Sequence, residues 1–470
     1  MSSLVFERFL STPEMIEAFG EVAIIQGMLD FEAALARAQA AAGVIPASAG
    51  EAIAGACRVE GFDLNVIVAA SSVAGTLAIP LVKQLTAAVA EVDAEAAGYV
   101  HWGSTSQDVI DTAMVLATRR ALALIDVRLC DLINALFGLV HRHGAVPLLG
   151  RTLMQPAQVI SFGFKLVSWV APLVRCRARL ARAAQAALKL QLGGAVGTLS
   201  VMGDAGAAVA DHMAASLQLV RPVGAWHTQR DEWVALGCEV GVLCGALGKI
   251  AKDISLLAQG EIGEVAEPSG GANGVGGVAR GGSSAMPHKR NPVASMIALA
   301  AAARAPQRVA ALLAAMPQEH ERGLGNWQAE LAEWPGLFMS AHGAVHALAD
   351  AVAGLELDPQ RMRSNIDALQ GLVFAEGASM LLARHVGKAK AHALLEALSK
   401  KAVTERRHLF ELTVEAVAAD PLLQSRVDQT ELRAVFDADA TARRASALAG
   451  PQLVALAASH HAHSETDSTP

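Results

Sequence analysis

Apolar residues recur every three to four positions along most of this chain, which is the period of an amphipathic helix. The pattern is continuous over five long stretches, at 113–143, 159–192, 231–261, 293–315 and 326–354. Alanine and leucine dominate these stretches, and they lack the alternation of β-branched residues that is typical of strands. The sequence therefore predicts an all-α protein whose core is a bundle of unusually long helices.

Breaks in this pattern predict how the chain is divided. Residues 1–111 hold short helical patterns and predict a small N-terminal helical domain, and residues 112–356 hold the long helices of a central bundle. A second group of short patterns at 357–450 predicts a small C-terminal helical domain. The last stretch, 451–470, is expected to be a disordered tail because its end is polar and poor in hydrophobic residues.

Four glycines are spaced by three or four residues within the stretch 231–261. Gly237, Gly241, Gly245 and Gly248 would leave one face of a helix without side chains. Each glycine costs about 1 kcal/mol relative to alanine in a helix interior. The spacing therefore predicts close packing by another segment, unless it simply reflects an alanine- and glycine-rich composition.

Charge and cysteine content narrow the functional classes. A net charge of −7 argues against nucleic acid as a partner. The apolar window 64–82 contains Asn65, Ser71 and Pro80, so we do not expect it to cross a membrane. The five cysteines form no Cys-x-x-Cys pair, and no secretory signal is visible, so we expect a cytoplasmic protein. No metal cluster, nucleotide fingerprint or other cofactor signal is apparent.

Residues 281–292 hold the densest chemical motif of the chain. They read Gly-Gly-Ser-Ser-Ala-Met-Pro-His-Lys-Arg-Asn-Pro. Two glycines permit close backbone approach, two serines supply hydroxyls, and Lys289 adds a cation. Such a loop is suited to handling a carbanion beside a carboxylate, although the same glycines and serines are also ordinary loop composition.

The motif resembles the signature Gly-Ser-Ser-x-Met-Pro-x-Lys-x-Asn-Pro of the fumarase/aspartase/argininosuccinate lyase superfamily. Two further signature regions of that superfamily resemble residues 101–112, His-Trp-Gly-Ser-Thr-Ser-Gln-Asp-Val-Ile-Asp-Thr, and residues 150–157, Gly-Arg-Thr-Leu-Met-Gln-Pro-Ala. The resemblance covers roughly residues 5–450. It implies the superfamily's helical fold and a homotetramer whose active sites are shared between subunits.

One position departs from the superfamily pattern. The second signature normally has a histidine where this chain has Leu153. An amine or hydroxide leaving group needs a proton from an acid such as histidine. A carboxylate has a conjugate-acid pKa of about 4 and can leave without that help. Leu153 therefore favours the branch of 3-carboxy-cis,cis-muconate cycloisomerases, which residues 26–38, 226–231 and 316–322 also resemble.

The resemblance implies a set of site residues for a small polycarboxylate substrate. Ser283 is expected to exchange the proton on the carbon next to a carboxylate, and Lys289 to stabilise the charge that develops. Expected substrate contacts are His101, Thr105, Ser106, Gln107, Arg151, Gln155, Ser284, Asn291, His320 and Arg322. Asp108 and Asp111 are instead expected to cap a helix that starts near Thr112.

Other interpretations remain open at this point. A muconate with a sulfonate in place of the 3-carboxylate would suit the same kind of anion site. An adenylosuccinate lyase-type enzyme would share His101 and residues 318–322, although Leu153 argues against it. A non-catalytic structural protein on the same scaffold is a third alternative. The glycine-rich segment 269–280 is expected to act as a lid that closes over substrate.

Overall fold

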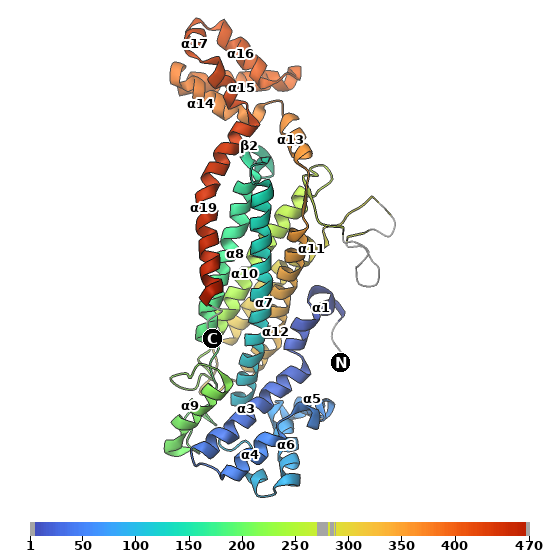
Figure 1. The fold of residues 1–470 in the computed structure, drawn as a ribbon, viewed down its shortest axis with the longest axis vertical. Helices are drawn as coiled ribbons and strands as arrows, with labels where there is room; N and C mark the ends of the chain where they lie inside the picture. The colour runs from blue at the N-terminus through green and yellow to red at the C-terminus, as the bar shows by residue number, and fades with distance from the viewer. Residues whose placement is uncertain (1–4, 270–280, 283–285, 287, 467–470) are drawn as a thin grey trace. The chain divides into compact units, whose positions relative to one another are not determined.

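The computed structural model describes residues 5–269, 281, 282, 286 and 288–466 (Figure 1). The chain divides into two compact units, and each is discontinuous in sequence. Unit 1 comprises Met1–Cys130, Cys176–Gly248 and Ile297–Ala347, and unit 2 comprises Asp131–Arg175, Lys249–Met296 and Leu348–Pro470. The linear boundaries 1–111, 112–356 and 357–450 remain predictions, because these units do not follow chain order.

Five long helices occupy the stretches that the apolar period predicts. They are α7 (Ser106–His143), α8 (Phe162–Ala187), α10 (Asp231–Leu257), α11 (Val293–Ala315) and α12 (Asn326–Ala353). Three of these helices contain a proline, at Pro172, Pro306 and Pro335. The prediction of an all-α fold built on long helices is confirmed.

The other helices of unit 1 are shorter than the five long ones. They are α1 (Val5–Leu10), α2 (Pro13–Ala18), α3 (Glu21–Ala41), α4 (Ala47–Ala56), α5 (Leu64–Ala74), α6 (Ala78–Val92) and α9 (Gly206–Leu217), with 3-10 turns at Val59–Gly61, Ala96–Tyr99 and Gly203–Ala205. Helix α3 packs on α4 and on α9, and its middle is buried almost continuously from Met28 to Ala36.

Unit 2 contains a hairpin and a set of C-terminal helices. Strands β1 (Pro147–Thr152) and β2 (Gln155–Ser161) pair antiparallel, and a second short pair joins β3 (Val265–Ala266) to β4 (Glu356–Leu357). The helices are α13 (Pro359–Asp367), α14 (Ala375–Val386), α15 (Lys388–Glu405), α16 (Leu409–Ala419), α17 (Pro421–Arg426), α18 (Gln429–Val435) and α19 (Ala438–Thr466), with a 3-10 turn at Leu372–Phe374. Figure 1 shows α14 to α17 gathered in one cluster, which has its own buried core.

The prediction of a disordered tail is wrong for residues 451–466. Helix α19 continues through this stretch, although Pro451 lies inside it. Leu453 and His460 are 9% and 2% exposed, and His460 Nε2 lies 3.2 Å from Asn134 Oδ1. The polar composition was therefore misleading, because one face of the segment packs against the rest of unit 2.

The glycine face of α10 receives α11, as its spacing predicts. A Cβ atom on Gly237, Gly241 or Gly248 would lie 2.8, 2.6 or 2.5 Å from a side-chain atom of Leu312, Val309 or Ala302. A Cβ atom on Gly245 would have no such neighbour within 4 Å. Three of the four glycines are thus needed for the close approach of the two helices, and the partners are side chains rather than backbone.

The N-terminal segment crosses α12 at a glycine and a buried histidine. A Cβ atom on Gly343 would lie 1.9 Å from the Leu10 carbonyl oxygen. Next to Gly343, the His342 ring has its Nδ1 2.9 Å from the Thr12 hydroxyl, which also accepts from Met15 N. The hydroxyl can donate to the Nδ1 of a neutral His342 ring while it accepts from Met15 N.

Acid is expected to weaken the fold through His342. Burial, helped by His346 and Arg128 and opposed by Glu14, lowers the pKa of His342 to about 4. The unfolded chain gains this proton near pH 6.5, so stability is present above pH 6.5 and is lost as the pH falls towards 4. The expected loss is about 3 kcal/mol. Urea unfolding at pH 7 and pH 4.5 measures it, with His342→Gln as the control. An equal loss in both proteins would contradict this account.

Candidate active site

The first signature region folds as a turn that leads into α7. His101 and Gly103 have positive φ angles of 60° and 73°, and the helix begins at Ser106. Thr105 N donates to Asp108 Oδ2 at 3.1 Å, so Asp108 caps the start of the helix as expected. The helix starts six residues earlier than the predicted Thr112, because the cap lies at Thr105.

Asp108 also fixes a loop from elsewhere in unit 1. Its buried carboxylate accepts from Gly193 N at 3.0 Å and Gly194 N at 2.9 Å, and it lies 2.7 Å from His227 Nε2. Every lone-pair position of this carboxylate is therefore used for structure. The turn that carries His101 and Thr105 is held in place by these bonds.

Three expected substrate contacts lie near one another in unit 1. The Arg322 guanidinium donates from Nη1 to Thr105 Oγ1 at 2.5 Å, and the Arg322 side chain is exposed. His101 lies in the same turn as Thr105, and its ring Nδ1 is 2.9 Å from Ser104 Oγ. His320 has a φ of 48° and is also exposed. These residues offer cationic and hydroxyl groups to an anion.

Asp111 and Gln107 depart from the expectations for them. Asp111 is 1% exposed, lies inside α7, and accepts from Arg230 Nη1 at 2.8 Å and from Trp327 Nε1 at 2.9 Å, so it caps nothing. Gln107 is also 1% exposed, and its amide donates to Asp111 and to the His227 carbonyl oxygen. Its amide is committed to this buried network rather than open to a substrate. Ser106 is the first residue of α7 and is half-buried.

Unit 2 holds the expected contacts of the second signature. The Arg151 guanidinium makes two bonds to the buried Glu264 carboxylate, at 2.9 and 2.7 Å. Asn365 donates to the same carboxylate at 2.8 Å. Arg151 is thus neutralised by its own chain and positions the hairpin, while Gln155 lies exposed at the start of β2.

Leu153 forms the tip of the hairpin. Thr152 pairs with Gln155, so Leu153 and Met154 are the two residues of the turn, and their φ angles are 49° and 67°. Positive φ at both positions matches a type I′ turn, which normally uses Asn-Gly or Asp-Gly. Each branched or bulky residue held there costs about 1–2 kcal/mol. Leu153 is 96% exposed and Met154 69%. Neither packing within the chain nor the backbone conformation of the turn therefore explains why leucine and methionine stand at these two positions.

The ends of the signature loop are fixed in unit 2. Asn291 N donates to the Gly281 carbonyl oxygen at 2.8 Å, which closes the loop over residues 281–291. The Glu267 carboxylate accepts from Ala294 N and Ser295 N at 2.9 Å and so caps α11. Lys289 is exposed. Ser283 and Ser284, and the lid predicted for 269–280 apart from Ser269, lie outside the described residues.

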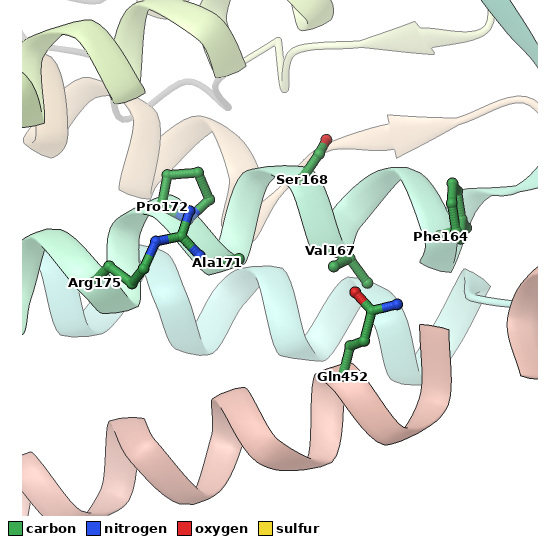
Figure 2. Close-up of a pocket in the computed structure, with 7 residues that line it drawn as sticks. All are labelled: Phe164, Val167, Ser168, Ala171, Pro172, Arg175 and Gln452. Atoms are coloured by element: carbon green, nitrogen blue, oxygen red, sulfur yellow. The ribbon is translucent and has the colours of Figure 1, made fainter. Parts of the chain in front are cut away.

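A groove on α8 contains none of the expected site residues (Figure 2). Its volume is about 380 Å³, and it is lined by Phe164, Val167, Ser168, Ala171, Pro172 and Arg175 of α8 and by Gln452 of α19. Substrate sites usually combine an apolar cavity with several convergent polar groups. This groove has few of them and is not our candidate active site.

The sequence profile of the lyase family matches residues 7–306. The chain belongs to this lyase family. The fumarase/aspartase-like fold expected from the signatures is therefore confirmed.

Individual relatives in the lyase family match nearly the whole chain. The chain is 45% identical to a 3-carboxy-cis,cis-muconate cycloisomerase of Bradyrhizobium diazoefficiens, with 91% of this chain and 92% of the relative covered. It is 47% identical to the cycloisomerase of the same name from Pseudomonas aeruginosa, with 86% and 87% covered. The crystal structure of the 3-carboxy-cis,cis-muconate lactonizing enzyme from Pseudomonas putida matches with a TM-score of 0.88 and 40% identity, over 98% of this chain and 99% of that one.

Two polar residues near the site were missed by sequence reasoning. Glu32 is 1% exposed, and its Oε1 lies 2.6 Å from His101 Nδ1. Glu264 is 0% exposed and holds Arg151. A signal for Glu32 was present, because Glu32 is the one charged residue in the stretch 31–36, and a carboxylate there is costly to bury and must have a partner.

Proposed function

We propose that this chain is a cycloisomerase that interconverts 3-carboxy-cis,cis-muconate and 4-carboxymuconolactone, in the bacterial degradation of protocatechuate. The observation that carries the proposal is Leu153. A hydrocarbon side chain stands at the tip of the hairpin where the superfamily signature has an acid. The names of relatives that are 45% and 47% identical support the same substrate.

The reaction needs no proton on the departing oxygen. In the lactonising direction, an oxygen of one substrate carboxylate forms a bond to the ring-closing carbon. The electron pair of the double bond moves into the carboxylate conjugated to it, which becomes an aci-carboxylate. The Ser283 hydroxyl then delivers its proton to the carbon next to that carboxylate, and the serine oxygen regains a proton from solvent. In the reverse direction a carboxylate leaves, and its low basicity makes an acid at position 153 unnecessary.

Cations must balance three substrate carboxylates and the charge of the intermediate. The net charge of −7 gives no long-range attraction for such an anion, so local groups have to bind it. Arg322 and His101 from unit 1, and Lys289 from the signature loop, are our candidates. Stabilisation of the developing charge is usually the largest catalytic contribution.

Ultraviolet absorbance tests this proposal against the alternatives. The conjugated diene of 3-carboxy-cis,cis-muconate is lost on lactonisation, so its absorbance should fall when the protein is added. Adenylosuccinate under the same conditions should show no change. Turnover of adenylosuccinate but not of the muconate would refute the proposal, and faster turnover of the 3-sulfo analogue would reassign the substrate.

We also propose a homotetramer whose active sites are shared between subunits. Helix α11 is apolar, yet only 22% of its most apolar window is buried within the chain, and Ala303, Ala310 and Leu313 lie on its exposed face. By length and composition, α10 and α11 could each span a membrane. Helix α13 and the segment Leu372–Val386 would together form a third possible span, which is bent by 79°. A helix of another subunit would cover the apolar face of α11 without any membrane.

The hairpin tip gives a second argument for shared sites. Leu153 is strained and exposed, which supports its entry into the active site of a neighbouring subunit.

Light scattering is expected to give four times the 48.7 kDa chain mass. Ala303→Arg on the exposed face of α11 should lower this mass, because it places a charge in the helix contact. Ala393→Arg on the exposed face of α15 is the control and should leave the mass unchanged. A monomeric mass for the unmodified chain would contradict the assembly.

We further propose a cytoplasmic location. Cys57, Cys238 and Cys244 are free thiols, and Cys57 and Cys244 are buried. Free thiols are typical of a reducing compartment.

A further inference from the structure

We propose that Glu32 is a positioning residue of the active site, whose buried carboxylate holds His101 as a cation that faces the substrate carboxylates. The inference rests on the proposed function for the role of His101 and adds a residue that the signatures do not contain. A short contact joins α3 to the turn before α7.

The contact joins a fully buried acid to a partly open base. Glu32 Oε1 lies 2.6 Å from His101 Nδ1, and the side chains are 1% and 19% exposed. Glu32 Oε2 is buried and has no hydrogen-bond partner among the residues that the structure describes. A carboxylate with so few partners is stable as an anion only if the group it contacts carries a positive charge.

The backbone holds the histidine ring in this place. His101 has a φ of 60°, which is rare for a residue with a side chain. Gln39 of α3 donates to the Trp102 carbonyl oxygen at 2.6 Å and so ties the same turn to the same helix. With Nδ1 directed at Glu32, the Nε2 edge is left for another group. Apart from Ser104 Oγ at 3.3 Å, no side chain of the described residues bonds to Nε2.

The charged groups around the ring favour the imidazolium. Burial by itself lowers the pKa of His101, but Glu32 and, more weakly, Asp108 raise it, and the net pKa lies above the usual value. Asp108 is already bound to His227. Burial and the Glu32 and Asp30 carboxylates raise the pKa of the Cys57 thiol, while Arg37 opposes the rise, so that thiol stays neutral. Arg322 is held by Thr105 on the open side.

Removal of the Glu32 charge is therefore expected to change the pH at which His101 titrates. The pKa of His101 in Glu32→Gln should fall by about one unit or more relative to the unmodified protein. Histidine Cε1 resonances of the full-length protein without substrate measure this, and His101→Gln assigns the signal. Glu32→Asp keeps the charge and should restore most of the shift.

The pH profile of kcat/KM gives the second readout. In Glu32→Gln, activity at pH 8 should drop about ten-fold or more and should recover as the pH is lowered towards 6. Gln39→Leu is the matched control, since it removes a neighbouring buried bond to the same turn without changing charge. It should lower kcat/KM equally at all pH values.

Two results would overturn the inference. One is an unchanged His101 pKa in Glu32→Gln, and the other is a pH-independent loss like that of Gln39→Leu. The resonance measurement needs no substrate. If the muconate is not turned over but the His101 pKa still falls, the proposed function fails and the pairing stands.

Discussion

Ser283→Ala is expected to reduce kcat for lactonisation by a factor of about 10³, with KM changed only a few-fold. The proton that Ser283 carries is transferred only in the reaction step, so its loss should affect the transition state and not the bound substrate. Steady-state absorbance with 3-carboxy-cis,cis-muconate measures both constants.

Ser284→Ala is the control for this prediction, because it removes a hydroxyl from the same loop. As a substrate contact, Ser284 should affect KM more than kcat. Comparable kcat values for Ser283→Ala and the unmodified enzyme would show that another group moves the proton.

Arg230→Met is expected to cost about 3–5 kcal/mol of unfolding free energy. Arg230 is 2% exposed and donates to both Asp111 and Glu330, and its guanidinium carbon lies 4.5 Å from the centre of the Trp226 ring. Burial raises the pKa of Glu330, and Arg230 opposes that rise. Without Arg230, two carboxylates are buried with no cation between them. Urea unfolding at pH 7 measures the loss.

Two further variants separate the buried charge from the loss of a side chain. Arg384→Met breaks an exposed pair with Glu431 and should cost less than about 1 kcal/mol. Replacing Asp111, Arg230 and Glu330 together with apolar residues should recover part of the stability that Arg230→Met loses. Equal losses for Arg230→Met and Arg384→Met would contradict this account of the core.

The long helices could be predicted from the sequence because each buries one continuous apolar face. Residues 293–315 were predicted to their ends, and 231–261 ended four residues too late. The hairpin at 147–161 was missed and partly assigned to a helix. Its turn residues, Leu153 and Met154, give no turn signal, since their backbone conformation is one that leucine and methionine rarely adopt.

The site was predictable only in part, for a similar reason. The signatures identify residues that we expect to face a ligand, such as Thr105 and Arg322, and the fold brings these two together. They do not reveal which polar residues are used internally. Gln107 is bound to the His227 carbonyl oxygen and Arg151 to the Glu264 carboxylate, and both partners lie on distant segments of the chain. Pairings across more than a hundred residues leave no local pattern in the sequence.

The central claim is that an oxygen of a substrate carboxylate closes the ring while solvent hydrogen is added to the carbon next to another carboxylate. Proton nuclear magnetic resonance of the product formed in deuterium oxide tests it most directly. We predict 4-carboxymuconolactone with one deuterium on that carbon and no other product. Unchanged 3-carboxy-cis,cis-muconate, or a product without the lactone ring, would contradict the account.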